Sequence, residues 1–235
     1  MTDFTVPRGS PGIPPRWTSS AKSAVGTAAR AESRVWFTVS HGILNEIYAS
    51  RLDTACVRDF GFIVTATNYF SDEKRDTRQT VAMIEDGVPA FRLVNTSIDG
   101  RYRISKTIFS DPVREVVLQE IQFEALVGAR SDYELHAIVA PHLVNAGADN
   151  TGWYGAFKGH EMLFAEGRGT SLAVASSVPW LMVNQTRLSA RAAVPTALLA
   201  LDVQRGGIPR DPVRSFKRTN PVLQTALLEA SVLEA

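Results

Sequence analysis

The stretch SRVWFTVSHGILNEIYASRLDTACVRDFGFIV, residues 33–64, carries the strongest structural signal of the chain. Two segments rich in β-branched and aromatic residues, 34–40 and 43–49, flank Gly42, and a third such segment covers 61–67. This composition is typical of strands, and a glycine between two strand-like runs favours a turn. The stretch therefore predicts neighbouring β-strands near the start of the fold.

Strand-like segments continue from this stretch toward residue 175 with turn residues between them. Residues 133–139 are the clearest case, because Tyr133, Leu135, Ala137 and Val139 alternate with polar neighbours. Segments spaced by roughly 8–12 residues are expected in a sandwich or barrel. The other candidate strands are 80–84, 90–96, 102–109, 115–123, 161–165 and 171–175, and Asp86-Gly87 and Asp99-Gly100 have the composition of tight hairpin turns.

Composition limits the functions that the chain can have. The formal net charge of the 235 residues is +1, so no broad basic field favours nucleic acid. The single cysteine, Cys56, cannot form an internal disulfide and is expected to be a buried apolar residue. No apolar run reaches the roughly 20 residues of a membrane span, and the first residues lack the pattern of a signal peptide. We expect a cytoplasmic protein without a membrane or nucleic-acid partner.

Several longer motifs carry a family resemblance: EKRDTR (73–78), GVPAFRLVNT (87–96), GRYRISKTIFSDP (100–112), APHLVNAGADNTGWYGAFKG (140–159) and SVPWL (177–181). Together with PGIPPRWTSSAKSAVGTA (11–28) and the opening stretch, they resemble the N-terminal β-sandwich of bacterial glucoamylases and glucodextranases, glycoside hydrolase family 15. The resemblance implies an all-β fold, a large antiparallel super-β-sandwich of the galactose-mutarotase-like type. Some relatives of this family are secreted.

The resemblance suggests three regions. Residues 1–32 are expected to be an extended lead-in that packs on the sandwich, and residues 33–181 are expected to form the sandwich itself. Residues 182–235 are rich in Ala, Leu, Arg and Pro and match the family poorly, which predicts an irregular or partly helical tail with a short helix over 221–235. One hypothesis is that this tail follows a truncation or a frame shift.

The activity implied by the resemblance is the release of glucose from α-glucans by inverting hydrolysis, with trehalose as another substrate among related enzymes. Such hydrolysis uses two carboxyl groups, one as acid and one as base. The family places its two glutamates in an (α/α)6-barrel that has no counterpart in this sequence. We therefore expect no catalytic residue, metal or cofactor here, and interpret the chain's own acids as strand-end and loop charges: Glu46, Asp53, Asp59, Glu73 and Asp76.

Aromatic residues in or beside the expected loops are the candidates for contact with carbohydrate or with a catalytic domain, because flat, partly polar rings suit both roles. Trp153 and Tyr154 are expected to be the most exposed of them. Arg75 and Asp76 are the candidates for a structural charge cluster that joins neighbouring elements, the alternative being a solvated surface cluster. The complete aromatic set is Trp17, Tyr69, Phe70, Trp153 and Tyr154.

Three functions remain open at this point. The first is a non-catalytic domain that supports an (α/α)6 catalytic barrel encoded downstream. The second is a carbohydrate-binding module that binds α-glucan oligosaccharides by itself, and the third is a nonfunctional remnant with exposed strand edges. Affinity of the isolated chain for maltooligosaccharides separates the second function from the first.

Overall fold

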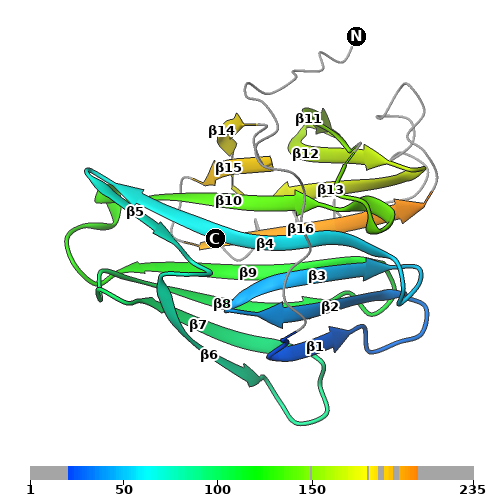
Figure 1. Ribbon diagram of the computed structural model, residues 1–235, viewed down its shortest axis with the longest axis horizontal. Helices are drawn as coiled ribbons and strands as arrows, with labels where there is room; N and C mark the ends of the chain where they lie inside the picture. Colours follow the sequence, from blue (N-terminus) through cyan, green and yellow to red (C-terminus); the bar gives the residue numbers. More distant parts are fainter. Residues whose placement is uncertain (1–20, 149, 179, 185–187, 193–195, 206–235) are drawn as a thin grey trace.

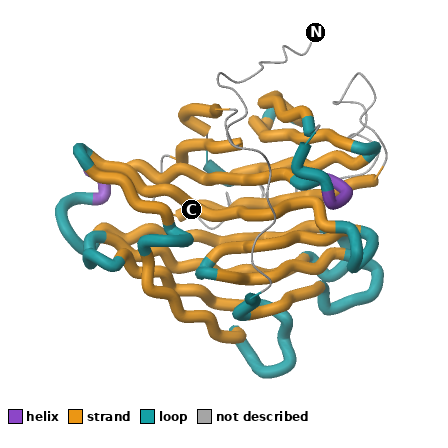
Figure 2. The backbone as a smooth tube through the Cα atoms, viewed as in Figure 1, coloured by secondary structure: helices purple, strands orange, loops and turns teal. Residues whose placement is uncertain are grey.

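The computed structural model describes residues 21–148, 150–178, 180–184, 188–192 and 196–205, with side chains described up to residue 178 (Figure 1). Within these ranges two eight-stranded antiparallel sheets form the molecule, and short 3-10 turns are the helical elements (Figure 2). The prediction of a large antiparallel β-sandwich is confirmed. None of the described helices has the length and hydropathy of a membrane-spanning segment.

The first sheet, here called sheet I, contains the opening stretch of the sequence and has the strand order β1-β2-β3-β4-β10-β15-β14, with β5 also paired to β4. Its neighbouring strands are all antiparallel. The strands are β1 (Ala24–Thr27), β2 (Val35–Ser40), β3 (Ile43–Ala49), β4 (Ala55–Ala66), β5 (Tyr69–Asp72), β10 (Glu134–Pro141), β14 (Trp180–Asn184) and β15 (Leu188–Ala192).

The second sheet, sheet II, has the order β11-β12-β13-β16-β9-β8-β7-β6, so that β6 and β11 are its edges. Its strands are β6 (Thr77–Met83), β7 (Phe91–Ser97), β8 (Tyr102–Ser110), β9 (Val116–Ala125), β11 (Thr151–Phe157), β12 (His160–Gly167), β13 (Thr170–Ser176) and β16 (Thr196–Arg205). Two 3-10 turns, η1 (Arg130–Asp132) and η2 (Leu143–Asn145), flank β10.

Alternating side chains build the core between the two sheets. On β10, Leu135, Ala137 and Val139 are buried in the core, whereas Glu134 and His136 are on the other face and partly exposed, as the sequence predicts. The same alternation runs through β7 and β8, where every second residue is buried. The core therefore extends across both sheets, and Cys56 is among its buried residues as expected.

A smaller apolar cluster lies on the opposite side of sheet II. On β12, Leu163 and Ala165 belong to the main core, and Met162 and Phe164 belong to a second cluster that also includes Trp153. Because neighbouring residues of a strand point to opposite faces, this second cluster covers the outer face of the sheet. The β11–β13 part of sheet II is therefore buried on both faces.

Both predicted turns join antiparallel strands, but neither is a tight two-residue turn, because residues 84–90 separate β6 from β7 and residues 98–101 separate β7 from β8. Gly87 lies between β6 and β7 with φ 82°, and Gly100 lies between β7 and β8 with φ 74°. Only glycine adopts this left-handed conformation without a steric penalty. Gly42 turns β2 into β3 with φ 71° in the same way.

The expected boundaries of the sandwich are wrong at both ends. β1 lies within the region expected to be a lead-in, yet it pairs with β2 in sheet I. Beyond residue 181, β15 pairs with β10 and β16 pairs with both β13 and β9. These segments are rich in alanine and leucine, which give little local preference for a strand. They form strands because neighbouring strands pair with them, and this pairing cannot be recognised from their own composition. The short helix expected over 221–235 lies outside the described residues.

Candidate functional site

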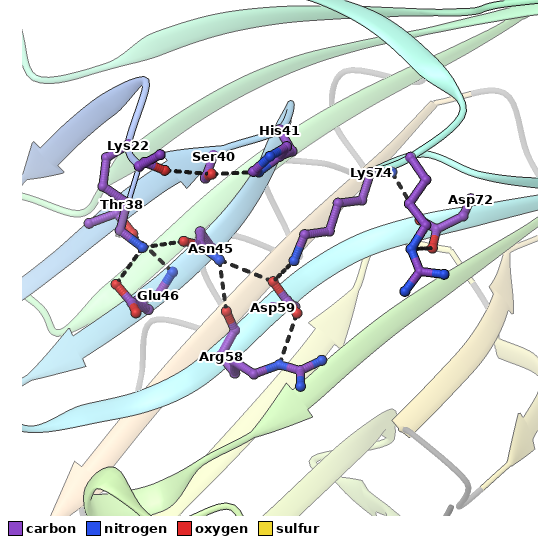
Figure 3. A network of polar contacts seen from close by, with 12 residues as sticks. Lys22, Thr38, Ser40, His41, Asn45, Glu46, Arg58, Asp59, Asp72 and Lys74 are labelled. Carbon is purple, nitrogen blue, oxygen red and sulfur yellow. Dashed lines mark hydrogen bonds and ion pairs between the residues drawn. The ribbon is translucent and has the colours of Figure 1, made fainter. Parts of the chain in front are cut away.

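A network of charged and polar side chains lies on the outer face of sheet I (Figure 3). We call it the Asp59 network. Asp59 on β4 lies at its centre and accepts from Lys74 Nζ at 2.8 Å, Arg58 Nε at 2.9 Å and Asn45 Nδ2 at 3.1 Å. Lys22 precedes β1, and its Nζ donates to Asn45 Oδ1 on β3 and also lies 2.8 Å from the Glu46 carboxylate. Its members are Lys22, Asn45, Glu46, Arg58, Asp59 and Lys74.

The Asp59 network joins separate parts of the sheet through charge-assisted bonds. Lys74 follows β5, Asp59 lies on β4, and Asn45 lies on β3 and is 0% exposed. Charge-assisted hydrogen bonds are stronger than neutral ones, and partial burial reduces screening by solvent. The network therefore holds the β5–β6 turn against β3 and β4.

A shallow depression opens beside this network. It is lined by Ile43, Gly61, Phe62, Ile138 and Ala140 together with the charged residues Arg58, Asp59, Asp72 and Lys74, and holds about 40 Å³. Small-molecule sites usually measure about 300–1,000 Å³. The depression therefore accommodates a few water molecules and is too small to enclose a sugar ring.

A second charged group is fully buried between the two sheets. Glu73, directly after β5, lies 2.7 Å from Lys106 Nζ on β8, and both side chains are 0% exposed. The Glu73 carboxylate also accepts from Asn95 Nδ2 at 2.6 Å and from the Phe62 backbone N–H at 3.1 Å. Lys106 Nζ donates to the Gly42 carbonyl at 2.6 Å. The pair thus ties the β2–β3 turn, β4, β7 and β8 together.

Burial raises the pKa of Glu73 and lowers the pKa of Lys106, while each partner's charge acts in the opposite direction. Perturbed ionisable groups often mark active sites when they lie in a cleft. The side chains of this pair are shielded from solvent, and their hydrogen bonds go to structural groups of both sheets. The arrangement indicates a structural role for Glu73, which sequence reasoning had treated as an ordinary loop charge.

Of the predicted aromatic residues, Tyr69 and Phe70 lie on β5, and Trp17 lies outside the described residues. Phe70 is 64% exposed. Tyr69 is partly buried, with its ring edge-on to Tyr133 at 6.3 Å and the Arg101 guanidinium 4.7 Å from the ring centroid. Phe70 is thus the candidate that presents a ring to solvent.

The expectation that Trp153 and Tyr154 are exposed is wrong for Trp153. Trp153 is 8% exposed, and its ring stacks on Phe164 at 5.5 Å in the second apolar cluster. Tyr154, its neighbour on β11, packs partly buried against the main core. The two rings point to opposite faces of β11 and form no common platform, because this polar-looking segment is a strand rather than a loop.

The predicted charge cluster has a different composition from the one expected. Arg75 Nε lies 3.6 Å from Asp72 Oδ2, and Asp76 Oδ2 accepts from the Asp72 N–H at 2.7 Å, so both side chains bond locally within their turn. Their flanking neighbours Glu73 and Lys74 make the contacts to other strands. Exposure rises along the turn from the buried Glu73 through Lys74 to the exposed Arg75 and Asp76, and this direction of the turn decides which charges face inward.

Two further acids singled out in the sequence, Glu46 and Asp53, contact basic side chains. Glu46 accepts from the Tyr48 hydroxyl at 2.9 Å as well as contacting Lys22. The bidentate contact with Arg51 lowers the pKa of Asp53 to about 2 on the surface. Within the described residues, no group of three or more His, Cys, Asp and Glu side chains has the arrangement of a metal site.

Comparison with known proteins gives this sandwich a family. A family model described as "Glucodextranase, domain N" matches residues 7–190. A glucoamylase of Clostridium sp. (strain G0005) is 39% identical over 171 residues, which cover 72% of this chain and 24% of that protein. The crystal structure of a bacterial glucoamylase complexed with acarbose superposes with a TM-score of 0.82 at 27% identity, covering 98% of this chain and 39% of that one.

The fold and these similarities therefore define a class of β-sandwich that occurs within larger glycoside hydrolases. The chain belongs to the glucodextranase domain N family and corresponds to the N-terminal domain of glucoamylase-like glycoside hydrolases. It spans about a quarter of the length of the Clostridium glucoamylase.

Proposed function

We propose that this domain is the non-catalytic support of a glucan 1,4-α-glucosidase or glucodextranase, whose inverting (α/α)6-barrel releases glucose from α-glucans. The observation that carries the proposal is the superposition of 98% of this chain on 39% of a bacterial glucoamylase. The bonds made by the five acids named in the sequence support it too, because inverting hydrolysis needs one carboxyl group as acid and one as base, about 6.5–9.5 Å apart and beside a sugar site. The domain orients the barrel and performs no turnover itself.

A chimera tests the supporting role. The chain replaces the matching quarter of the Clostridium glucoamylase, and glucose release from maltooligosaccharides is compared among the chimera, the parent enzyme and the isolated chain. We expect activity from the chimera and none from the isolated chain. Glucose release by the purified chain, or a folded chimera without activity, would count against the proposal.

The second candidate, carbohydrate binding by the isolated domain, has one observation in its favour, the exposed ring of Phe70 beside Tyr69. Titration calorimetry with maltooligosaccharides tests it. Phe70→Ala is compared with Leu52→Ala, a matched control because Leu52 is also a large apolar side chain exposed to a similar degree, 66% against 64%. Binding that is lost only in Phe70→Ala favours the binding module, and absence of binding in the unsubstituted chain favours the supporting domain.

A further inference from the structure

The edge strand β6 leaves half of its backbone hydrogen-bonding groups without a neighbouring strand. Among the described strands, β6 pairs with β7 alone and ends sheet II (Figure 1). The Ile84 N–H donates to the Ala90 carbonyl at 3.0 Å and the Ile98 N–H donates to the Asp76 carbonyl at 2.9 Å. Along an antiparallel pair of strands, residue pairs that exchange backbone hydrogen bonds alternate with pairs that do not. The even-numbered residues therefore bond to β7, and Thr77, Gln79, Val81 and Met83 direct their N–H and C=O groups to the open edge.

This edge lacks the features that usually prevent strand pairing. Natural edges are protected by prolines, bulges, several charges or a short length. The sequence TRQTVAM of β6 has seven residues, one charge and no proline, and its register with β7 has no irregularity. Most of the strand is exposed, including Met83 at 45%. No described strand other than β7 pairs with β6, so within the described residues this edge is available to another strand.

We propose that β6 pairs antiparallel with β6 of a second copy of this chain, around a twofold axis at Thr80, and so joins two copies of sheet II. In this register Thr77 faces Met83 of the second copy and Gln79 faces Val81. In this register each odd-numbered residue of β6, whose backbone N–H and C=O groups point to the open edge, faces an odd-numbered residue of the second copy. The two residues of each such pair can therefore exchange backbone hydrogen bonds. Thr80 faces its own counterpart, and Thr–Thr pairs are favourable across strands.

The turns at the two ends of β6 are complementary in charge, which is the argument for a second copy over another protein. Arg75, in the turn before β6, has a side chain that is 79% exposed, and Glu85, in the turn after β6, is also exposed. Antiparallel pairing around Thr80 places the turn of Arg75 beside the turn of Glu85 of the second copy. The twofold axis repeats this opposite-charge contact at the other end.

Cysteine cross-linking provides the first test. At a non-hydrogen-bonded antiparallel pair the Cα atoms lie about 4.5 Å apart, within the range of a disulfide. Thr80→Cys is therefore expected to give a disulfide-linked dimer under oxidising conditions, since the native Cys56 is buried. Gln122→Cys is the control, because Gln122 is also exposed on the outer face of sheet II but lies on the interior strand β9. Cross-linking of Thr80→Cys no faster than the control overturns the proposal.

Sedimentation of the full chain over a range of concentrations provides the second test. We expect a monomer–dimer equilibrium whose Kd rises about tenfold or more in Thr80→Lys, because two like charges then meet at the axis. Arg75→Glu and Glu85→Arg each weaken the dimer, and the double substitution restores it because the charges are again complementary. A monomer at every concentration, or a dimer indifferent to these substitutions, overturns the proposal, and circular dichroism verifies that each variant is folded.

Discussion

At the scale of single residues, the Glu73–Lys106 pair is an ion pair whose two side chains are fully buried. Both side chains are shielded from solvent, and together they bond to groups of both sheets. Taking one partner away leaves the other charge buried and uncompensated, which typically costs about 3–5 kcal/mol. Replacing both removes the charges together, and in other proteins this is often far less harmful.

We therefore predict a strong coupling in a double-mutant cycle. Glu73→Gln and Lys106→Met are each expected to lower the free energy of unfolding by about 3–5 kcal/mol. The double variant is expected to lose less free energy of unfolding than the two single variants lose together, and the difference is expected to be about 2 kcal/mol or more. Urea unfolding of the four proteins measures this coupling. Penalties that simply add would show that the two charges act independently.

Tyr48 supplies a prediction of pH dependence. Burial, together with the hydrogen bond to the nearby Glu46 carboxylate, raises the pKa of Tyr48 from 10.0 to about 12. A folded-state pKa above the unfolded one means that this contribution to stability is complete below pH 10 and disappears as the pH rises toward 12. Removing the carboxylate removes the part of the shift that Glu46 causes.

Ultraviolet titration of the tyrosines measures this effect. We expect Glu46→Gln to lower the pKa of Tyr48, and Tyr48→Phe to identify the signal by removing it. Denaturant unfolding at pH values between 10 and 12 is expected to show a loss of stability in the parent chain that Tyr48→Phe reduces. An unchanged Tyr48 pKa in Glu46→Gln would mean that burial alone causes the shift.

At the scale of elements, β1 packs so closely on β2 that it requires a glycine. A Cβ atom added to Gly26 would lie 2.1 Å from the ring of Phe37, which is fully buried and edge-on to Phe91 at 6.1 Å. The ring cannot move without disturbing the core, because protein interiors are closely packed. Gly26 thus fixes how near β1 approaches the core.

Gly26→Ala is expected to lower the free energy of unfolding by about 1–3 kcal/mol through overpacking. Val25→Ala on the same strand is the matched control, since Val25 is 64% exposed, and its effect is expected to stay within about 0.5 kcal/mol. Thermal or urea unfolding of both variants measures the difference. Equal effects would indicate that β1 shifts away from Phe37 at little cost.

At the scale of the whole molecule, β16 connects the two parts of sheet II. It lies between β13 and β9 and pairs with each over seven residues, Thr170–Ser176 and Val116–Gln122 respectively. Without β16, sheet II would consist of the separate groups β11–β13 and β6–β9, each with a new unpaired edge. The segment that sequence analysis assigned to an atypical tail is therefore central to the sheet.

Truncation tests this role. A chain ending after residue 205 is expected to unfold cooperatively, whereas a chain ending after residue 181 is expected to lose cooperative unfolding and to aggregate, because it lacks β15 and β16. Circular dichroism during urea titration and sedimentation measure both properties. Equal stability of the two chains would show that sheet II closes without β16.

Segments with alternating apolar residues or many β-branched residues could be recognised from the sequence. Their own side chains determine that the segment forms a strand and which of its residues face the core. Residues 133–139 illustrate this, since their predicted faces agree with the buried and exposed sides of β10. The turns at Gly87 and Gly100 could also be predicted from the sequence, because the ability to adopt a positive φ depends on the glycine itself and not on residues distant in sequence. The sequence by itself thus determined the fold class, most of the strands and the family resemblance.

The tertiary structure alone decided which side chains meet and which strands complete the sheets. Trp153 is buried because Phe164 lies opposite it on the neighbouring strand, and Glu73 is ionically bonded because Lys106 reaches it from the other sheet. The plain segment of β16 is a central strand because β9 and β13 pair with it on both sides. These properties depend on partners distant in sequence, and local residue preferences carry no information about such partners.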